Sequence, residues 1–330
     1  MNIKLKKFFY RHKIISVIAI LLIFAAIFFT IVDLSLYIPV KMEPNTTKSS
    51  FGATKSKVYV QKGKEDKVNN TLSFYKNILE NNNNYIVDGF EITVFMSKDN
   101  RLIVAENDLL DSFTNCKVNP FSQKNAKISS KTVGELKQYN AAYFMGEKDG
   151  YPYRNIGIDL SYFRIITLDE LIVYLNTQSV DWKKTFNLII NIGDKNNLNN
   201  IVSQLNTTLK DYNYAKNCVV VTKSDYLKSI LENYPDLMRT ASNSEVSDLY
   251  FKAAFGVKDI EVSYDILYVN AFNSGVNLAR NRIVDYARYC DIPIIFKDIS
   301  SIKKIQKTAN LKPDGIAGIL PKDIYLETIK

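Results

Sequence analysis

The sequence predicts an α/β protein folded as a (β/α)8 TIM barrel and preceded by a single N-terminal transmembrane helix. Two observations carry this prediction. An uncharged apolar run lies near the N-terminus, and short β-branched runs alternate with longer helical patterns over the rest of the chain. With 330 residues the chain can hold an anchor and one large domain, because α/β barrels of about 250 residues fold as one unit.

The apolar run extends from Ile14 to Val32 and contains no charged residue. At about 1.5 Å rise per residue such a helix spans a hydrocarbon core of about 30 Å, so we expect a transmembrane helix over residues 14–36. Basic residues gather in 1–13, and the positive-inside rule places this tail in the cytoplasm and the rest of the chain outside the cell. A cleaved signal peptide is the alternative, although no A-x-A site ends the run.

A polar segment follows, and we expect it to form a stalk over 37–56, with the barrel over 57–330. The β-branched runs predict strands at 58–60, 85–94, 186–192, 218–222, 266–269, 292–296 and 315–319. The helical patterns lie at 72–79, 168–175, 198–209, 226–231, 276–289 and 299–309. A total of about eight strands favours a closed barrel over an open doubly wound sheet, and it places functional groups at the carboxyl ends of the strands.

Charge, cysteine and histidine content exclude several kinds of function. The net charge is +9, but the lysines are scattered among acids and asparagines, whereas nucleic-acid binding needs a clustered basic stripe. Cys116, Cys218 and Cys290 form no CxxC pair, so neither a zinc site nor a disulfide framework is expected. The only histidine, His12, precedes the apolar run. Everything beyond that run must therefore transfer protons with other residues, or catalyse nothing.

Several stretches of the outer domain form an ordered series. Residues Val58 to Asn115 read VYVQKGKEDKVNNTLSFYKNILENNNNYIVDGFEITVFMSKDNRLIVAENDLLDSFTN, and KTVGELKQY begins at Lys131, LIINIGDK at Leu188 and KPDGIAGILP at Lys312. This series resembles the glycerophosphodiester phosphodiesterases, whose pattern is roughly HRG, PENT, ExD, TKDG and HD. The resemblance implies a barrel that hydrolyses glycerophosphodiesters to glycerol 3-phosphate and an alcohol. It also implies two histidines as acid and base, and a carboxylate-held divalent metal such as calcium or magnesium.

At the acid and base positions that the resemblance implies, the residues have changed. Gln61 and Glu106 stand where the family has its two histidines, and Lys62 stands where it has an arginine. An amide cannot exchange a proton near neutral pH. Glu106 can act as an acid only if its surroundings raise its pKa.

The metal positions have changed in the same way. Glu91 remains from ExD, but Thr93 replaces its aspartate; at the family's ExK, Asn191 and Gly193 stand instead, with Lys195 two residues further on. One carboxylate is left where the family has three, and a hard divalent cation needs more negative charge than that. We therefore expect no cofactor, and we take Lys62 and Lys195 as the candidate substrate-binding cations.

Two functional hypotheses follow. In the first, the protein is a catalytically degenerate relative at the cell surface, with a binding or structural role towards a glycerophosphodiester, a lipid headgroup or a protein. In the second, it is an active phosphoric diester hydrolase that uses calcium or magnesium and a site rearranged around Glu91, Glu106, Lys62 and Lys195. A glycosidase-type pair formed by Glu91 and Glu106 is a third alternative. We expect specificity to lie in the loop over 107–153.

Overall fold

The computed structural model describes residues 13–36, 51, 56–61, 69–80, 87–118, 125–144, 150–151, 153–154, 160–182, 184–258, 261–273, 276–299 and 301–318. Within these residues, eight parallel strands follow one another in the order β7-β6-β5-β2-β1-β12-β11-β8. They are β1 (Lys57–Val60), β2 (Gly89–Met96), β5 (Asn187–Ile192), β6 (Cys218–Val220), β7 (Met238–Arg239), β8 (Leu267–Asn270), β11 (Ile294–Ile299) and β12 (Gly315–Gly318).

The two ends of this series meet. A parallel bridge joins Thr240 to Ile266. The backbone N–H of Ala241 donates to the carbonyl oxygen of Ile266 at 2.9 Å, and the N–H of Asp265 donates to that of Arg239 at 3.0 Å. The edges beside β7 and β8 are thus hydrogen-bonded to each other, which gives a TIM-like barrel. The barrel part of the predicted fold class is confirmed.

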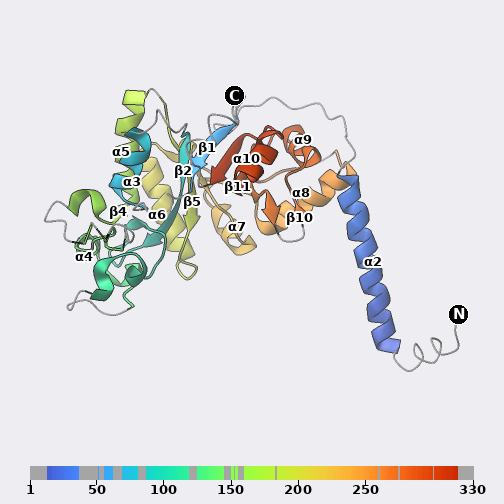
Figure 1. Cartoon of the computed structure of the whole chain (residues 1–330), viewed down its shortest axis with the longest axis horizontal. Coiled ribbons are helices and arrows are strands. Elements are labelled where there is room, and N and C mark those ends of the chain that lie inside the picture. Colours follow the sequence, from blue (N-terminus) through green and yellow to red (C-terminus); the bar gives the residue numbers. More distant parts are fainter. Residues whose placement is uncertain are drawn as a thin grey trace.

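Helices surround the strands (Figure 1). α3, α5 and α6 lie on one side of the sheet in that view, and α8, α9 and α10 lie on the other. The bounds of the helices around the barrel are α3 (Leu72–Glu80), α5 (Leu168–Trp182), α6 (Leu198–Asp211), α7 (Asp225–Leu231), α8 (Asn243–Phe255), α9 (Asn281–Tyr289) and α10 (Ile302–Ala309).

Several predicted boundaries differ from the observed ones. The helix expected over 276–289 begins only at Asn281, because the preceding residues form a short antiparallel hairpin of β9 (Phe272–Asn273) and β10 (Val276–Asn277). The strand expected over 85–94 begins at Gly89. In addition, β7 and α8 complete one βα unit that the apolar pattern did not indicate.

The barrel lumen is filled by side chains from alternate positions of its strands. Tyr59, Ile189, Val219, Ile295 and their neighbours form one buried cluster, whereas the intervening residues pack outward against the helices. Tyr59 lies low in the lumen between two glycines, since a Cβ on Gly89 would lie 3.0 Å from its ring and one on Gly315 would lie 2.8 Å from it. The lumen is therefore a packed core, and polar groups are left to its carboxyl end.

An insertion interrupts the barrel after β2. β3 (Leu102–Val104) runs antiparallel to β2 and pairs with β4 (Ile166–Thr167). Among the described residues between them lie α4 (Val133–Leu136) and four short 3-10 helices (Leu110–Ser112, Asn115–Val118, Ile128–Ser130 and Leu160–Phe163). The described residues of this insertion have a buried cluster of their own that includes Phe95, Ile103 and Leu136. The described residues of the segment 107–153, which we expected to be a mouth loop, therefore belong to a folded insertion; the rest of the segment lies outside the described residues.

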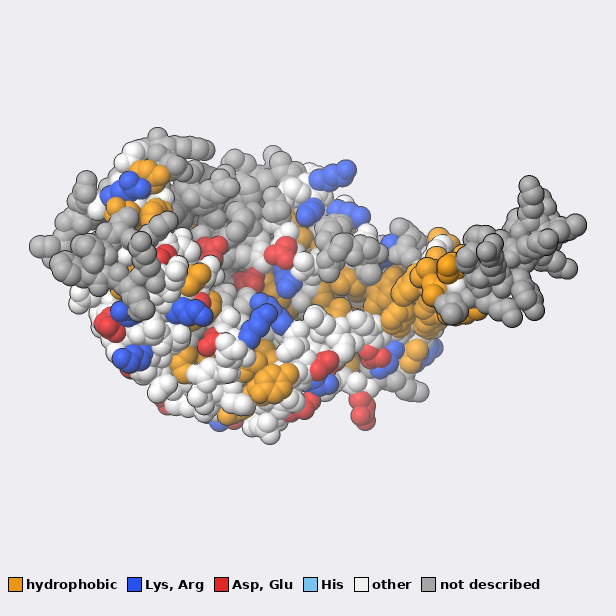
Figure 2. Space-filling model, turned by 90° about the horizontal axis from the view of Figure 1, so that it is seen from below, with side chains coloured by type: hydrophobic (Ala, Val, Ile, Leu, Met, Phe, Trp, Pro, Cys, Tyr) orange, Lys and Arg blue, Asp and Glu red, His pale blue; other side chains and the backbone are white. Residues whose placement is uncertain are grey.

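The N-terminal apolar run forms α2 (Lys13–Ser35), which extends away from the barrel beside α8 (Figure 1). The apolar side chains of α2 lie along this projection, whereas the barrel surface in the same view carries scattered charges of both signs (Figure 2). The last turns are docked, because Val32 is buried and Arg282 donates to the carbonyl oxygen of Ser35 at 2.6 Å. In the part of the chain that is described, no helix meets the combined length and hydropathy of a membrane span. The transmembrane part of the predicted fold class is therefore not confirmed.

Candidate functional site

Polar side chains collect where the barrel strands end. Gln61 directly follows β1, Glu91 and Thr93 lie on β2, and Asn191 lies on β5 opposite Thr93. These residues continue the alternation that points Tyr59 and Ile189 into the lumen. Together with residues from three other segments, all of them except Asn191 line a cavity of about 190 Å³, which we call the acidic hollow. It is lined by Gln61, Asn70, Glu91, Thr93, Glu106 and Asp298.

Glu91 is held by three uncharged donors. The Asn191 amide donates to its Oε1 at 2.5 Å, the Tyr268 hydroxyl donates to its Oε2 at 2.5 Å, and the Gln61 amide donates to Oε2 as well. Tyr268 comes from β8 and is 5% exposed, and Asn191 is 6% exposed. Hydrogen bonds to an ionised acceptor are about twice as strong as bonds between neutral groups. The arrangement therefore stabilises a carboxylate without any cation.

The electrostatics of Tyr268 fit this role. Burial, followed by the negative charge of Glu91 and the hydrogen bond to it, raises the pKa of Tyr268 well above its ordinary value. A phenol with a raised pKa stays protonated and acts as a donor, so it is unsuited to accept a proton. Tyr268 thus belongs to the scaffold that holds Glu91.

Asp298 reaches the hollow because β11 is irregular at its end. The register between β11 and β12 shifts between Phe296 and Ile299, and Asp298 has a left-handed backbone with φ of 58°. Its carboxylate accepts a hydrogen bond of 3.3 Å from the Gln61 amide. Aspartate tolerates the left-handed region better than most residues. A bulge thus adds an acid that the strand pattern does not predict.

The structure brings together most of the residues predicted from the sequence. Gln61, Glu91, Thr93 and Glu106 line one hollow, and Asn191 contacts Glu91 there. Glu106 is exposed two residues after β3. The exposed Lys195 follows β5 without lining the hollow, and Lys62 lies outside the described residues.

Gly193 explains why a lysine is absent at that point of β5. A Cβ at this residue would lie 2.2 Å from the ring of Phe95. Phe95 is 6% exposed and packs in the core of the insertion. A side chain at residue 193 would therefore have to displace a buried aromatic ring.

A divalent cation does not fit this set of side chains. Both oxygens of Glu91 already accept hydrogen bonds, and two of the three donors are amide NH₂ groups that would face a cation with their hydrogens. A hard cation needs several oxygen ligands with compensating charge. Among the described residues, no group of three or more His, Cys, Asp or Glu side chains is placed to hold a metal ion.

Tyr268, whose hydroxyl contacts Glu91 of the acidic hollow, also lines a second cavity. This lysine cavity, as we call it, measures about 290 Å³, and Lys223, Tyr268, Asn270 and Lys297 are among the residues that line it. Sequence reasoning missed its lysines. Side chains two residues apart in a strand point the same way, so the lumen residues Val221 and Ile295 could have indicated Lys223 and Lys297 as the next inward positions.

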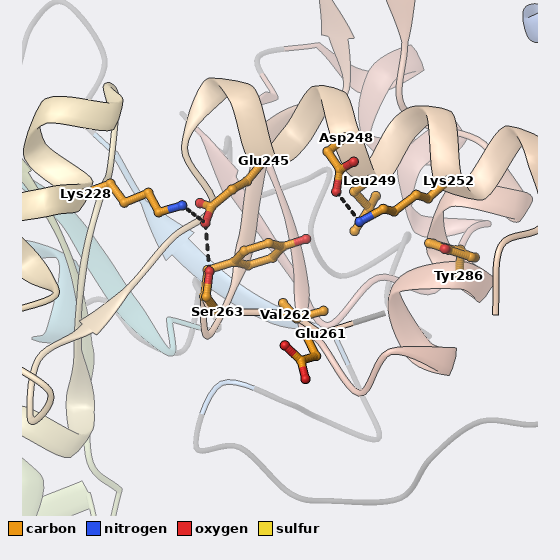
Figure 3. Close-up of a pocket in the computed structure, with 10 residues that line it drawn as sticks. Lys228, Glu245, Asp248, Leu249, Lys252, Glu261, Val262, Ser263 and Tyr286 are labelled. Carbon is orange, nitrogen blue, oxygen red and sulfur yellow. Dashed lines mark hydrogen bonds and ion pairs between the residues drawn. The ribbon is translucent and has the colours of Figure 1, made fainter. Parts of the chain in front are cut away.

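A third cavity lies on the flank of the barrel, between α7, α8 and the segment before β8, and measures about 210 Å³ (Figure 3). Glu245 accepts hydrogen bonds from Ser263 at 3.0 Å and from Arg239, and it pairs with Lys228 at 3.1 Å. Partial burial opposes its ionisation, but the bonds from Arg239, the Ser242 backbone and Lys228 hold the pKa of Glu245 well below its ordinary value. The charge of Glu245 is therefore matched by neighbouring side chains of the fold, and we assign these contacts a structural role.

Comparison with known proteins identifies the fold. No family model and no curated protein matches the sequence. Among solved structures, the chain is similar to a glycerophosphoryl diester phosphodiesterase domain from Mycobacterium tuberculosis, with a TM-score of 0.62 at 16% identity over 83% of this chain and 98% of that one. It is also similar to an Oleispira antarctica phosphodiesterase in complex with the product sn-glycerol-3-phosphate, with a TM-score of 0.59 at 15% identity over 83% of this chain and 97% of that one. A third similar structure is a glycerophosphodiester phosphodiesterase from Agrobacterium tumefaciens, with a TM-score of 0.57 at 12% identity over 82% of this chain and 99% of that one. The chain therefore has the fold of the glycerophosphodiester phosphodiesterases.

Proposed function

We propose that this chain is a phosphodiesterase-like barrel that binds a ligand at the carboxyl end of its strands without hydrolysing it. The observation that carries the proposal is the state of Glu91. Its carboxylate is held by Gln61, Asn191 and Tyr268, so internal hydrogen bonds occupy the oxygens that a metal-dependent hydrolase would offer to its cation.

The chemistry of proton transfer supports the same reading. Hydrolysis of a phosphodiester needs one group to activate water and another to protonate the leaving oxygen. Gln61 donates its amide hydrogens to Glu91 and Asp298, and an amide neither gains nor loses a proton near neutral pH. The only histidine of the sequence, His12, precedes the barrel. The fold is that of the phosphodiesterases, but the acid and base of the reaction are not evident among these residues.

Turnover assays test the proposal. The full chain, purified in mild detergent, would be incubated with glycerophosphocholine and with an aryl phosphodiester, in the presence of calcium or magnesium. We expect no turnover above buffer, in the wild type and in Glu91→Gln alike. Metal-dependent turnover that Glu91→Gln abolishes would overturn the proposal in favour of an active hydrolase with a rearranged site, and its loss in Glu106→Gln as well would assign Glu106 to that site.

We also propose that α2 attaches the barrel to the cell membrane, with residues 1–13 in the cytoplasm and the barrel outside. Support comes from the uncharged run Ile14 to Val32 and the basic tail before it. Large apolar side chains along α2 are exposed, among them Leu22 at 64% and Phe24 at 67%. Exposed apolar surface of this extent marks a contact with lipid or with another protein.

Extraction of membranes tests the attachment. We expect the full chain to stay with the membrane pellet in alkaline carbonate, and Leu22→Lys combined with Phe24→Lys to release it. Val180→Lys is the matched control, because Val180 is 78% exposed on α5. A wild-type chain found in the soluble fraction would contradict membrane attachment.

A further inference from the structure

The lysine cavity combines two cations with apolar walls. Lys223 follows β6 and Lys297 lies on β11, so separate strands supply the two ammonium groups to one cavity. Lys297 lies over the ring of Tyr268, with 5.1 Å between its Nζ and the ring centroid. Val269 and Leu278 are buried and contribute apolar lining. The cavity can therefore receive a molecule with an anionic end and a small apolar body.

The lysines of this region have no ion-pair partner among the described residues. Lys195, Lys223 and Lys297 form no ion pair with an acidic side chain in the described ranges. Partial burial lowers the pKa of Lys223, and the charges of Lys297 and Lys195 lower it further, against the opposing effect of Glu91 and Asp298. Glu91 is already held by its own donors. Like charges that converge in this way are relieved by an anion from outside.

The two lysines favour a doubly charged anion. A phosphate monoester carries a charge of about −1.5 to −2 at neutral pH and three acceptor oxygens, whereas a phosphodiester carries a single charge. The ammonium group of lysine is a compact point charge with three donors and binds phosphate without a fixed fork. The Asn270 side chain is a further polar group of the lining.

We infer that the lysine cavity is a binding site for a small organic phosphate monoester, with Lys223 and Lys297 on the phosphate and Val269 and Leu278 against the organic group. This inference rests on the proposed binding role of the barrel and names its ligand class. The monoester is either a free molecule or the headgroup of a lipid.

Calorimetric titration of the full chain with phenyl phosphate tests the site. We expect saturable binding in the wild type. The affinity should fall roughly tenfold in each of the single variants Lys223→Gln and Lys297→Gln, since each removes one charged hydrogen-bonding partner. Lys223→Arg, which keeps the charge, should retain binding. Lys258→Gln is the matched control, because Lys258 is exposed between α8 and β8, at the opposite end of the barrel. Thermal unfolding of each variant establishes that it is folded.

Vesicles distinguish the two sources of the monoester. Phosphatidylcholine vesicles doped with phosphatidic acid would be titrated with the wild type and both glutamine variants. Vesicle binding that depends on the two lysines and competes with phenyl phosphate would assign a lipid headgroup as the ligand. Phenyl phosphate binding without lysine-dependent vesicle binding would assign a free ligand. Both outcomes support the site. Absent phenyl phosphate binding, or phenyl phosphate binding equal in the wild type and both glutamine variants, would overturn the site. Turnover in the phosphodiester assay would instead overturn the proposed function, so the two failures are distinguishable.

Discussion

The acidic hollow and the lysine cavity are linked through Tyr268, which contacts Glu91 of the hollow and lines the cavity, and the two differ in how their charges are matched. In the hollow, Glu91 accepts hydrogen bonds from three residues of its own barrel. In the cavity, Lys223 and Lys297 converge, and neither forms an ion pair with an acidic side chain among the described residues. A charge that the fold itself satisfies stabilises the fold, whereas a charge left unsatisfied is poised for a ligand. Stability measurements separate the two cases.

The largest effect is expected for Glu91→Leu. Removing the carboxylate leaves the amide hydrogens of Gln61 and Asn191 and the hydroxyl of Tyr268 without their acceptor, at a cost of about 3 kcal/mol in the free energy of unfolding. Urea unfolding measures it. Glu106→Leu in the same hollow serves as control and should stay within about 0.5 kcal/mol, because Glu106 is exposed. An unchanged Glu91→Leu variant would mean that the hydrogen bonds do not stabilise the fold.

Gly193→Ala tests why the hollow lacks a lysine on β5. The added Cβ meets the buried Phe95 ring, so we expect a loss of about 2 kcal/mol through overpacking. The control is Gly134→Ala in α4, where the nearest atom to an added Cβ is 4.0 Å away. That variant should be neutral or slightly more stable, because alanine favours helix. Equal stability of the two variants in thermal unfolding would show that Phe95 yields easily.

Tyr268→Phe removes the hydroxyl that donates to Glu91. We expect the free energy of unfolding to fall by about 1.5 kcal/mol at neutral pH, because the charged carboxylate loses one donor. The pKa of Tyr268 is raised from its ordinary 10.0. The stability that its neutral form contributes is therefore fully present below pH 10 and is lost as the pH rises towards the folded-state pKa.

The difference between wild type and Tyr268→Phe should accordingly narrow in unfolding experiments above pH 10. Other buried tyrosines such as Tyr59 and Tyr75 also have raised pKa values, and their contribution cancels in this difference. A difference that stays constant with pH would contradict the hydrogen bond to Glu91.

The smallest effect is expected for Lys223→Gln. Burial and neighbouring ammonium groups lower the pKa of Lys223, so its charged form opposes folding at neutral pH and its removal should change stability by no more than about 0.5 kcal/mol. Urea unfolding beside Lys258→Gln measures this. A large loss in the free energy of unfolding would mean that Lys223 makes a stabilising contact within the fold. The charges of the hollow and of the lysine cavity would then both be matched internally.

Much of the barrel could be predicted from the sequence, since buried parallel strands read as β-branched runs. Asn187–Ile192 and Cys218–Val220 lie where those runs predicted them. β7 was missed because a strand of two residues, Met238–Arg239, has no such run. α8 was missed although Ser242 and Glu245 form a capping box, whose S-x-x-E spacing is readable in the sequence.

The candidate site could be predicted in part. The positions Gln61, Glu91, Thr93, Glu106 and Asn191 came from ordered stretches, and the structure places their side chains at one end of the barrel. Their partners did not follow from the same reasoning, because Tyr268 is separated from Glu91 by 177 residues. Asp298 depends on a bulge that shifts the register of β11.

The sequence by itself determined the alternation of strands and helices and which side chains end the strands, because both depend on local periodicity. It also determined that the barrel contains no histidine. Only the tertiary structure decided which charges are satisfied. Glu91 meets donors 30, 100 and 177 residues away, whereas Lys223 and Lys297 meet each other across a cavity. Whether a charge is matched depends on the closure of the ring, which brings distant strands to one lumen.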